Sequence, residues 1–476
     1  MGLKSSGGYR ESLKKLKPNV YINGKRIKNI VDNPFLKPGI NTISVTYDLA
    51  VDDRYKELMT VQSAEIGETI NRFNHIHQTS EDLISKLKMI RECCHRTLCA
   101  QRCMGMDCIN SLTIVTQQID KKHKTPYSER FQKFLKYFQE NDLVAAVAMT
   151  DVKGNRSLRP SEQPDPDMYL HVVEKDDEGI IVKGAKVHTT VAPHAHEIMA
   201  IPTRAMNETE GEYSIAFSIP NDTKGLTMIC KAGKSFNDEK PELSSRHNTI
   251  ESLTVFDNVF VPWERVFLCG EHEFSGSLAT AFATYHRHSY NACKPAYGDI
   301  VIGASALVAE HNGIQDKSHV KEKIARLVYH NQICWACGIA GSVNGTKTES
   351  GAYFPDMGLV NIGKLHSGES FHEEFHLLQD IAGGLTVTLP SKEDYENPEI
   401  RGYMDKYLKG ADNISTRDRI NLFRFIKDLT ASDFGGLFSV AGIHGGGSPQ
   451  AQCIEILRQY DIDEKKKIVK DLADIR

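Results

Sequence analysis

The sequence lacks an excess of charge of either sign. It has 58 Lys and Arg residues against 62 Asp and Glu residues, which gives a formal net charge of −4 at pH 7. Proteins that bind nucleic acid or anionic lipid usually carry a clear excess of basic residues. We therefore expect no nucleic acid and no membrane among the partners of this chain.

Long apolar runs are also missing. The longest run, residues 300–309, is about half the length that a bilayer-spanning helix needs. The N-terminus has no apolar stretch of the kind found in secretory signals. The 11 cysteines are partly clustered, and without an extracellular address they favour a reducing compartment. We expect a soluble, cytoplasmic protein.

Glycine-rich phosphate loops are the third absence. The chain has neither a G-x-G-x-x-G fingerprint nor a Walker A loop, which disfavours a Rossmann dinucleotide domain and a P-loop nucleotidase. It shows no internal repeat and no low-complexity linker. Its 476 residues are enough for two or three domains with large cores.

The chain does contain a clear order of helical, strand-rich and helical segments. Residues 52–140 have helical periodicity. Short β-branched segments between Gly, Pro, Asn and Asp then indicate an antiparallel β domain: residues 169–173, 179–188, 212–218, 225–231 and 250–261, with a hairpin turn at 175–179. Helical periodicity returns after Pro262, over residues 286–294, 299–310, 318–340, 362–380 and 415–429.

We predict an α+β fold with three domains. They are a helical N-terminal domain (1–140), a central antiparallel β domain (141–270) and a C-terminal helical bundle (271–476). The same order is found in the acyl-CoA dehydrogenase-like architecture, in which a flavin lies between the β domain and the helical domains.

Two pairs of soft metal ligands have helical spacing, Cys99-x3-Cys103 and His286-x6-Cys293. Residues four or seven positions apart lie on the same side of a helix. A capping-box pattern starts at Thr79, and Cys99 and Cys103 extend the apolar face of the helix after it if that helix continues. Two helices from distant parts of the chain would then close a four-ligand metal site.

The spacing alone leaves alternatives open. Free cysteine is usually a small buried hydrophobe, and zinc also accepts three cysteines and a histidine. The pair Cys334-x2-Cys337 lacks a second half-motif, so we interpret it as core packing. Cys93, Cys94 and Cys108 flank the first pair and compete with it as ligands; only their register disfavours them.

Eight segments resemble those of the 4-hydroxybutyryl-CoA dehydratases, a branch of the 4-hydroxyphenylacetate 3-hydroxylase family. They include CAQRCMGMD at 99–107, YHRHSYNACK at 285–294 and HGGGSPQAQ at 444–452, and the others are residues 140–143, 148–156, 184–190, 255–262 and 380–384. The resemblance covers nearly the whole chain. In that branch, the positions of Cys99, Cys103, His286 and Cys293 bind a [4Fe-4S] cluster.

The resemblance also implies FAD and a homotetramer. The residues at flavin-binding positions are Thr150, Lys153, Arg156 and Thr190, with Gln101 close by. The adenosine end of the flavin packs against the neighbouring subunit near residues 380–384, which include Gly383 and Gly384.

The family chemistry explains why both cofactors are needed. Loss of water from a 4-hydroxyacyl-CoA requires removal of a C3 proton that the thioester does not acidify. If a proton leaves C2 and FAD withdraws one electron, the resulting radical makes the C3 hydrogen far more acidic. The iron aids departure of hydroxide as a Lewis acid, and the electron returns at the end.

The resemblance assigns four catalytic residues. His286 is a cluster ligand that also acts as a base, Tyr290 donates to the departing hydroxyl, and Lys294 steadies the nearby charge. Glu251 corresponds to a carboxylate of the family site. Each also has an ordinary interpretation, such as an interface tyrosine or a lysine that reaches solvent.

One position departs from the family. Just upstream of His444 the dehydratases have a glutamate that works with the active-site tyrosine, and here the residue is Ala441. An alanine cannot transfer a proton. The nearest acids are Asp433 and Glu455. Another acid or water can substitute, the protein can catalyse only double-bond isomerisation of a vinylacetyl-type thioester, or its substrate is a different acyl-CoA.

Two other classes of function stay open. Residues 261–265, VPWER, read like the flavin-dependent aromatic monooxygenases of the same family. Three cysteines and a histidine alone fit a non-catalytic scaffold that zinc stabilises.

Overall fold

The computed structural model describes residues 3–237 and 242–475 and divides into two compact units. Unit 1 comprises Met1–Lys240, Ser244–His286 and Lys347–Phe354, and unit 2 comprises Pro241–Leu243, Arg287–Thr346 and Pro355–Arg476. Unit 1 mixes helices and strands, and unit 2 is mainly helical. The prediction of a mixed fold with a helical C-terminal region is confirmed.

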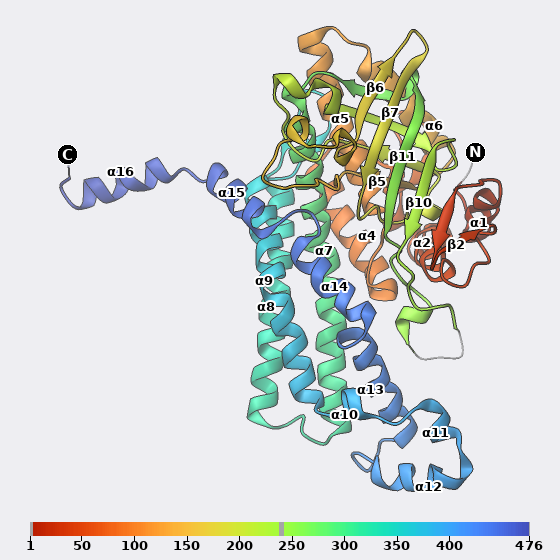
Figure 1. Ribbon diagram of the computed structural model, residues 1–476. Coiled ribbons are helices and arrows are strands. Elements are labelled where there is room, and N and C mark those ends of the chain that lie inside the picture. Colours follow the sequence, from red (N-terminus) through yellow and green to blue (C-terminus); the bar gives the residue numbers. More distant parts are fainter. Residues whose placement is uncertain (1–2, 238–241, 476) are drawn as a thin grey trace. The chain divides into compact units, whose positions relative to one another are not determined.

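The N-terminal part of unit 1 is mainly helical (Figure 1). Its helices are α1 (Ser6–Lys14), α2 (Lys37–Val51), α3 (Lys56–Met59), α4 (Ser80–Thr97), α5 (Cys103–His123) and α6 (Tyr127–Glu140). Of these, α4, α5 and α6 lie in the range 52–140 that the periodicity predicts to be helical. α4 begins at the predicted capping box, where the Thr79 hydroxyl accepts a hydrogen bond from the backbone N–H of Asp82 at 3.2 Å. The bond satisfies one of the free donors of the first turn.

Among its described residues, unit 1 has two larger sheets. Their strand orders are β2-β1-β10-β11-β7-β6 and β12-β9-β8-β5. The strands are β1 (Val20–Ile22), β2 (Lys25–Ile27), β5 (Ala145–Ala148), β6 (His171–Lys175), β7 (Gly179–Lys186), β8 (Glu197–Ala200), β9 (Ile215–Pro220), β10 (Leu226–Cys230), β11 (Ser252–Pro262) and β12 (Val266–Cys269). A further pair joins β3 (Thr60–Gln62) to β4 (Thr69–Asn71). In Figure 1, β6, β7, β11 and β10 run side by side.

The prediction of a purely antiparallel β domain is wrong where β1 pairs with β10 and where β5 pairs with β8, because both pairs are parallel. β5 and β8 are buried along their whole length. Such strands lack the alternation of apolar and polar residues that marks a strand in a sequence. The predicted hairpin is confirmed: β6 and β7 are antiparallel, and the N–H of Asp176 donates to the carbonyl of Gly179 at 3.0 Å.

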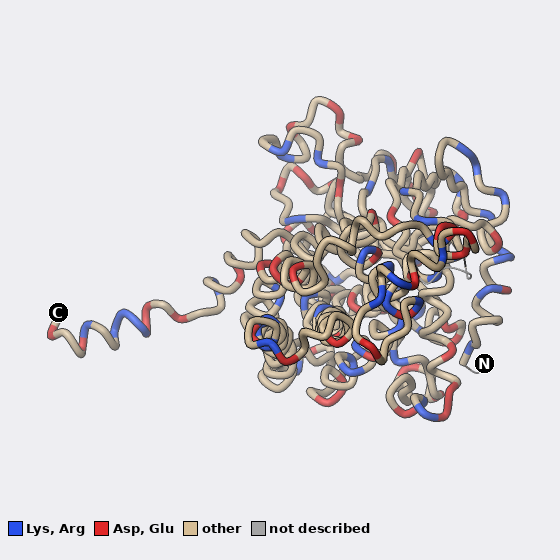
Figure 2. Tube along the Cα trace, turned by 90° about the horizontal axis from the view of Figure 1, so that it is seen from below, with Lys and Arg blue, Asp and Glu red and all other residues tan. Residues whose placement is uncertain are grey.

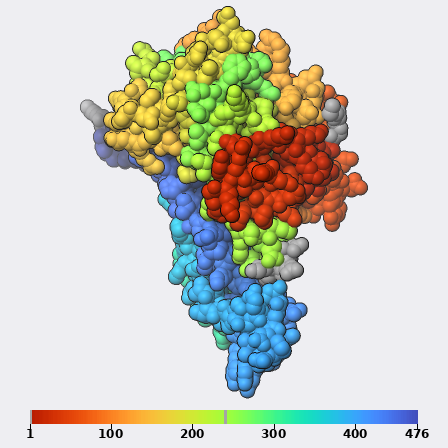
Figure 3. Space-filling view, turned by 45° about the vertical axis from the view of Figure 1, so that its right-hand side comes forward, coloured from red at the N-terminus to blue at the C-terminus, as the bar shows by residue number. Residues whose placement is uncertain are grey.

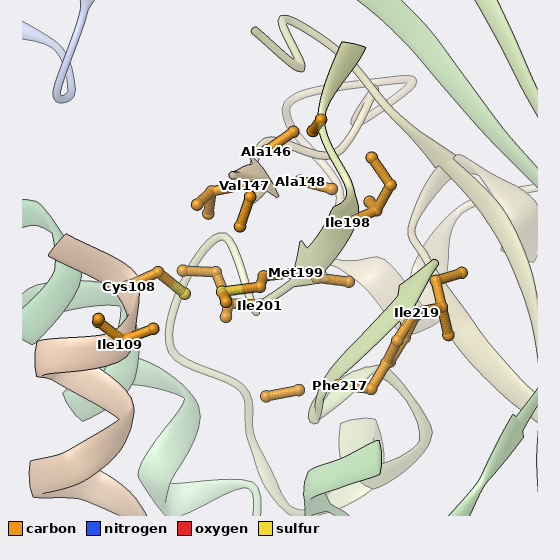
Figure 4. Packing of buried hydrophobic residues seen from close by; sticks show 14 of the residues in the cluster. Cys108, Ile109, Ala146, Val147, Ala148, Ile198, Met199, Ile201, Phe217 and Ile219 are labelled. Atoms are coloured by element: carbon orange, nitrogen blue, oxygen red, sulfur yellow. The ribbon is translucent and has the colours of Figure 1, made fainter. Parts of the chain in front are cut away.

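The core of unit 1 joins α5 to the second sheet (Figure 4). Cys108 and Ile109 of α5 lie in the same buried cluster as Met199 of β8 and Phe217 of β9. Figure 4 shows these side chains among other apolar groups. Burial raises the pKa of the Cys108 thiol, because the core disfavours a thiolate. Cys108 is therefore a core residue, as its register indicates.

The prediction that one helix carries both Cys99 and Cys103 is wrong. α4 ends at Thr97, the capping residue Leu98 after it has a left-handed φ of 64°, and α5 begins only at Cys103. Cys99 thus lies in the connection between the two helices. The buried Arg102 anchors this connection, since its guanidinium donates to the Asp142 carboxylate at 2.8 Å.

Unit 2 contains the C-terminal part of α7 (Glu273–His311), which merges two of the predicted helical segments. The other helices are α8 (Ser318–Val343), α9 (Met357–Ala382), α10 (Leu385–Thr388), α11 (Lys392–Glu396), α12 (Pro398–Tyr407), α13 (Thr416–Thr430), α14 (Asp433–His444), α15 (Pro449–Gln459) and α16 (Ile462–Leu472). The short strands β13 (Thr346–Lys347) and β14 (Tyr353–Phe354) pair with each other, and Lys347–Phe354 belong to unit 1. α8 and α9 lie side by side (Figure 1). Within the described residues, none of the helices has the length and apolar character to cross a membrane.

Charged residues of both signs alternate along the trace in Figure 2. Many pair within one helix, as Lys133 does with Glu129 on α6 at 2.6 Å. Such exposed pairs contribute little to stability, because solvent screens their charges. The N-terminal residues, red in Figure 3, form a continuous part of the surface of unit 1.

Candidate functional site

Three ligand-type side chains converge in unit 1. The Sγ of Cys103, a carboxylate oxygen of Asp107 and a ring nitrogen of His286 all lie within 4.8 Å of one another. Cys103 is the first residue of α5, Asp107 lies one turn later, and His286 comes from α7. A thiolate, an imidazole and a carboxylate are ligands that zinc and iron accept.

Asp107 is a candidate site residue that the spacing argument missed. It is fully buried, and its Oδ2 lies 2.9 Å from Nδ1 of His286. Its Oδ1 accepts a hydrogen bond from Nζ of Lys86 at 2.6 Å. Lys86, on α4, is also fully buried and donates to the carbonyl of Tyr285 at 2.9 Å. The sequence held a signal for Asp107, because it lies four residues after Cys103 on one helix.

The remaining predicted ligands lie in two different elements. Cys99 is half-buried in the connection after α4, and its carbonyl accepts from the Thr97 hydroxyl at 3.0 Å. Cys293 is half-buried on the part of α7 that belongs to unit 2, seven residues after His286. The structure thus groups Cys103 with His286, and the ligand roles of all four residues stay predictions.

Thr190, a predicted flavin-binding residue, contacts Glu251, a predicted catalytic residue, beside β11. The hydroxyl of Thr190 lies 3.0 and 2.9 Å from the two carboxylate oxygens of Glu251. Burial raises the pKa of Glu251 to about 7, although the hydrogen bond from Thr190 and the charge of Lys231 act in the opposite direction. Glu251 is therefore present in both protonation states near neutral pH.

Gln101 presents an unused acceptor. It is buried in a left-handed conformation, and its Nε2 donates to the carbonyl of Asn248 at 2.7 Å. Its Oε1 is buried and, among the residues that the structure describes, has no hydrogen-bond partner. The hydroxyl of Thr189, next to Thr190, is likewise buried and unpaired. A bound group with its own donors and acceptors would satisfy both atoms.

The predicted flavin residues after β5 lie on an irregular segment. Thr150 is half-buried, and its carbonyl accepts from the N–H of Val187 at 2.8 Å. Lys153 is half-buried with a φ of 72°, and burial and the nearby Arg156 lower its pKa. Arg156 is exposed. The two cations suit a phosphate group.

The end of α9 carries the predicted glycines of the adenosine contact. Gly383 has a φ of 80° and comes directly after the last residue of the helix. Gly383 and Gly384 are both exposed, and a Cβ at either position would have no neighbour within 4 Å. This part of unit 2 leaves room for another group.

Tyr290 and Lys364 both contact the C-terminal end of α14 in unit 2. The Tyr290 hydroxyl donates to the carbonyl of Ala441 at 3.4 Å. Lys364, fully buried on α9, donates to the carbonyl of Gly442 at 2.8 Å. Its Nζ lies 4.9 Å from the centre of the Tyr290 ring. Burial, assisted by the positive charge of Lys294, lowers the pKa of Lys364 to about 7.

Lys294 lies in the same part of unit 2. Its Nζ is 5.5 Å from the centre of the Tyr290 ring and 4.4 Å from that of Phe371. The side chain is buried, so the solvent-reaching interpretation does not apply to it.

Asp433 and Glu455 are the acids that the sequence suggested near position 441, and unit 2 also contains a buried acid that the sequence reasoning missed. Asp433 is exposed at the start of α14, and Glu455 pairs with Arg458 at 2.7 Å. Glu374 on α9, which the sequence reasoning missed, is only 7% exposed and accepts from the Ser370 hydroxyl at 3.0 Å. Burial raises its pKa to about 7, and the charge of Lys294 acts against this rise.

Known proteins resemble this chain over its full length. A family model described as the N-terminal part of 4-hydroxyphenylacetate 3-hydroxylase matches residues 6–268, and the model of its C-terminal part matches residues 275–474. A 4-hydroxybutyryl-CoA dehydratase/vinylacetyl-CoA-Δ-isomerase from Clostridium aminobutyricum is 42% identical over 100% of both chains. The oxygenase component of a 4-hydroxyphenylacetate 3-monooxygenase from Thermus thermophilus is 29% identical over 91% of this chain and 89% of that protein.

Solved structures give the same two groups of relatives. An oxygen-tolerant archaeal 4-hydroxybutyryl-CoA dehydratase from N. maritimus has a TM-score of 0.96 and 40% identity, over 100% of this chain and 96% of that one. The oxygenase component of a 4-hydroxyphenylacetate 3-monooxygenase, solved with FAD, has a TM-score of 0.88 and 26% identity over 98% of both chains.

The packing of Tyr290 generates a first prediction. A Cβ at Gly445 would overlap the Tyr290 hydroxyl, whereas a Cβ at Gly436 on α14 would have no neighbour within 4 Å. We expect Gly445→Ala to destabilise the protein by ~1–3 kcal/mol, as overpacking commonly does. Gly436→Ala should stabilise it by up to about 1 kcal/mol, because alanine favours a helix. Denaturant unfolding measures both, and equal effects of the two substitutions would contradict this packing.

Proposed function

Because the chain belongs to the 4-hydroxyphenylacetate 3-hydroxylase family, we propose that it is an acyl-CoA dehydratase of the dehydratase branch. It converts 4-hydroxybutyryl-CoA, or a related 4-hydroxyacyl-CoA, into crotonyl-CoA, and it isomerises vinylacetyl-CoA. The observation that carries this proposal is that two of the predicted ligands, Cys103 and His286, lie within 4.8 Å of each other beside Asp107, in a chain that resembles a dehydratase over its full length.

We propose FAD and a [4Fe-4S] cluster as cofactors. Cys99, Cys103, His286 and Cys293 would hold the cluster, since three cysteines and a histidine are soft or borderline ligands. Gln101, Thr150, Lys153, Arg156 and Thr190 would hold FAD, and the unpaired acceptor of Gln101 supports a polar group at its side. When bound, FAD supplies one-electron chemistry and the iron supplies Lewis acidity toward a substrate oxygen.

The side chains would move the protons. The Glu251 carboxylate would accept the C2 proton, and its pKa of about 7 suits a base at neutral pH. His286 would be a labile ligand and would also act as the base that accepts the C3 proton. The Tyr290 hydroxyl, which donates to a carbonyl in the structure, would donate to the departing hydroxyl. Lys294 would hold positive charge beside it, as its contact with the Tyr290 ring supports.

A flavin-dependent aromatic monooxygenase is the second candidate, because the FAD-bound oxygenase component has the same fold at 26% identity. A zinc-stabilised scaffold is the third. The absorption spectrum of protein purified without air separates them. We expect broad brown absorption together with flavin bands; flavin bands alone would favour the monooxygenase, and neither feature would favour the scaffold.

The ligand set generates a prediction about iron. We expect about four iron and four sulfide per chain after anaerobic purification. Cys99→Ala, Cys103→Ala and Cys293→Ala should each lose the cluster and the activity, because each removes a thiolate ligand. Cys334→Ala is the matched control, since Cys334 is buried and its Sγ contacts the side chain of Asn291 at 3.5 Å. Stoichiometric zinc without acid-labile sulfide would refute the cluster, and loss of iron in the control alone would show that the ligands are wrongly chosen.

The environment of Glu251 generates a prediction about pH. The group must be ionised to act as a base, so kcat/KM should rise with pH through about 7. Thr190→Val removes a hydrogen bond that favours the carboxylate, so the rise should move to higher pH. Thr190→Ser keeps the hydroxyl and should leave it in place. A profile that does not differ between the valine and serine variants would exclude Glu251 as the titrating base.

We propose a homotetramer in which a second subunit completes the flavin site near residues 380–384. The open space beside Gly383 and Gly384 supports this arrangement. Light scattering should give four chains per particle, and dilution below the assembly concentration should release FAD, because its adenosine end loses its cover. A monomer that retains stoichiometric FAD would contradict the shared site.

The alanine at position 441 generates the last prediction of this section. If a carboxylic acid there protonates the leaving hydroxide in the relatives, dehydration by this chain should be slower by the ~10²–10⁴-fold that general acids contribute. Isomerisation of vinylacetyl-CoA expels nothing and should be less affected. Ala441→Glu should then raise dehydration more than isomerisation.

The matched control is Val440→Glu, because Val440 is 59% exposed and directly precedes Ala441 on α14. It adds the same charge to the same helix and should change neither rate. Fast dehydration by the unmodified chain, unchanged by Ala441→Glu, would show that another group, such as Glu374, supplies the proton.

A further inference from the structure

We infer that Asp107 and Lys86 form a positioning pair that holds the His286 ring with Nδ1 toward Asp107 and so leaves Nε2 as its metal-binding nitrogen. This inference rests on the proposed function, since it assumes that His286 binds the cluster. It adds two residues that act through the ligand and do not themselves bind the metal.

The two oxygens of Asp107 have separate tasks. Oδ2 lies 2.9 Å from Nδ1 of His286, and Oδ1 lies 2.6 Å from Nζ of Lys86. An ionised carboxylate only accepts hydrogen bonds, so Nδ1 must carry the proton in this contact. A neutral imidazole protonated at Nδ1 has its lone pair on Nε2. The contact therefore selects one of the two tautomers.

The ammonium of Lys86 compensates the charge of the buried Asp107 carboxylate. Neither side chain of the pair has any exposed surface, and an unpaired buried carboxylate would cost several kcal/mol. Lys86 also donates to the carbonyl of Tyr285, the residue directly before His286. The same ammonium thus contacts the carboxylate that orients the ring and the backbone that carries it.

The ring plane has a second restraint. Phe282, one turn earlier on α7, stacks on His286 with ring centres 5.5 Å apart and an interplanar angle of 12°. Stacking fixes the plane of the imidazole, and the contact with Asp107 fixes its rotation within that plane. Together the two contacts leave one orientation for Nε2.

The alternative is that Asp107 is itself a metal ligand, since its oxygen belongs to the same 4.8 Å group. Removal of the carboxylate distinguishes the two roles. Loss of a positioning partner weakens metal retention by ~10–100-fold, whereas loss of a ligand abolishes the site.

The test replaces the whole pair by apolar residues, in the variant Lys86→Met/Asp107→Leu. Apolar replacement of a buried ion pair is often neutral for stability, so this variant should fold even if Asp107→Leu alone does not. Lys88→Met is the matched control, because Lys88 lies two residues later on α4 and is exposed. Thermal unfolding of the cluster-free proteins shows whether each variant folds.

Two properties are then measured on the loaded proteins, neither of which is activity. The first is the rate at which a chelator removes iron, which we expect to be ~10–100-fold faster in the double variant and unchanged in Lys88→Met. The second is the hyperfine coupling of ¹⁵N-histidine to the reduced cluster, which should change in the double variant only.

Two outcomes would overturn the inference. Unchanged iron release and unchanged coupling in a folded double variant would show that Asp107 does not orient the ring. Complete loss of iron, equal to that in Cys103→Ala, would show that Asp107 is a ligand. If the unmodified protein holds no iron and sulfide at all, the proposed function fails instead, which separates the two claims.

Discussion

The arrangement of the candidate metal site, formed by Cys103, Asp107 and His286, depends on a buried ion pair between Lys86 and Asp107. A lysine and an aspartate without any exposed surface are tolerated in a core only if their charges and hydrogen bonds meet. The pair joins α4 to α5, and the contact of Lys86 with the Tyr285 carbonyl joins both to α7. Three helices that are distant in the chain are thus held in one register around His286.

The connection between α4 and α5 is held by a second buried charge. Arg102 donates to Asp142 at 2.8 Å, and its guanidinium lies 4.3 Å from the centre of the Tyr47 ring. These contacts fix a segment in which Leu98 and Gln101 both have left-handed backbones. Neither residue is a glycine, so the surrounding contacts must outweigh the local preference for φ below zero. The result is a bend that takes Cys99 out of the helix and leaves the Gln101 acceptor buried without a partner in the described part of the chain.

Strong periodicity made the long helices predictable from the sequence, and capping chemistry located the start of α4 at Thr79. Two kinds of feature could not be predicted in this way. β5 and β8 are buried on both faces, so their sequences carry no alternation. The end of α4 at Thr97 depends on tertiary contacts and has no glycine or proline to mark it. For the site, cysteine and histidine spacing pointed to Cys103 and His286. A search for soft ligands does not include aspartate, so it misses Asp107. Lys86 is a charged residue on an apolar helix face, and its sequence position gives no sign of its partner.

The contacts at the end of α14 show what an alanine at position 441 can and cannot do in place of a carboxylate. The last carbonyls of a helix carry partial negative charge, and here those of Ala441 and Gly442 accept from Tyr290 and Lys364. A helix end can therefore orient the phenol and stabilise the buried ammonium, as a carboxylate would. In the proposed mechanism it cannot replace the proton that Tyr290 would give to the leaving group, because a carbonyl has none to donate. Any group that returns a proton to Tyr290 must be titratable near neutral pH. In unit 2, burial moves the pKa of both Lys364 and Glu374 to about 7. Of these two groups it is Lys364 that lies against the Tyr290 ring, so the geometry of α9 favours the ammonium over the carboxyl for that task.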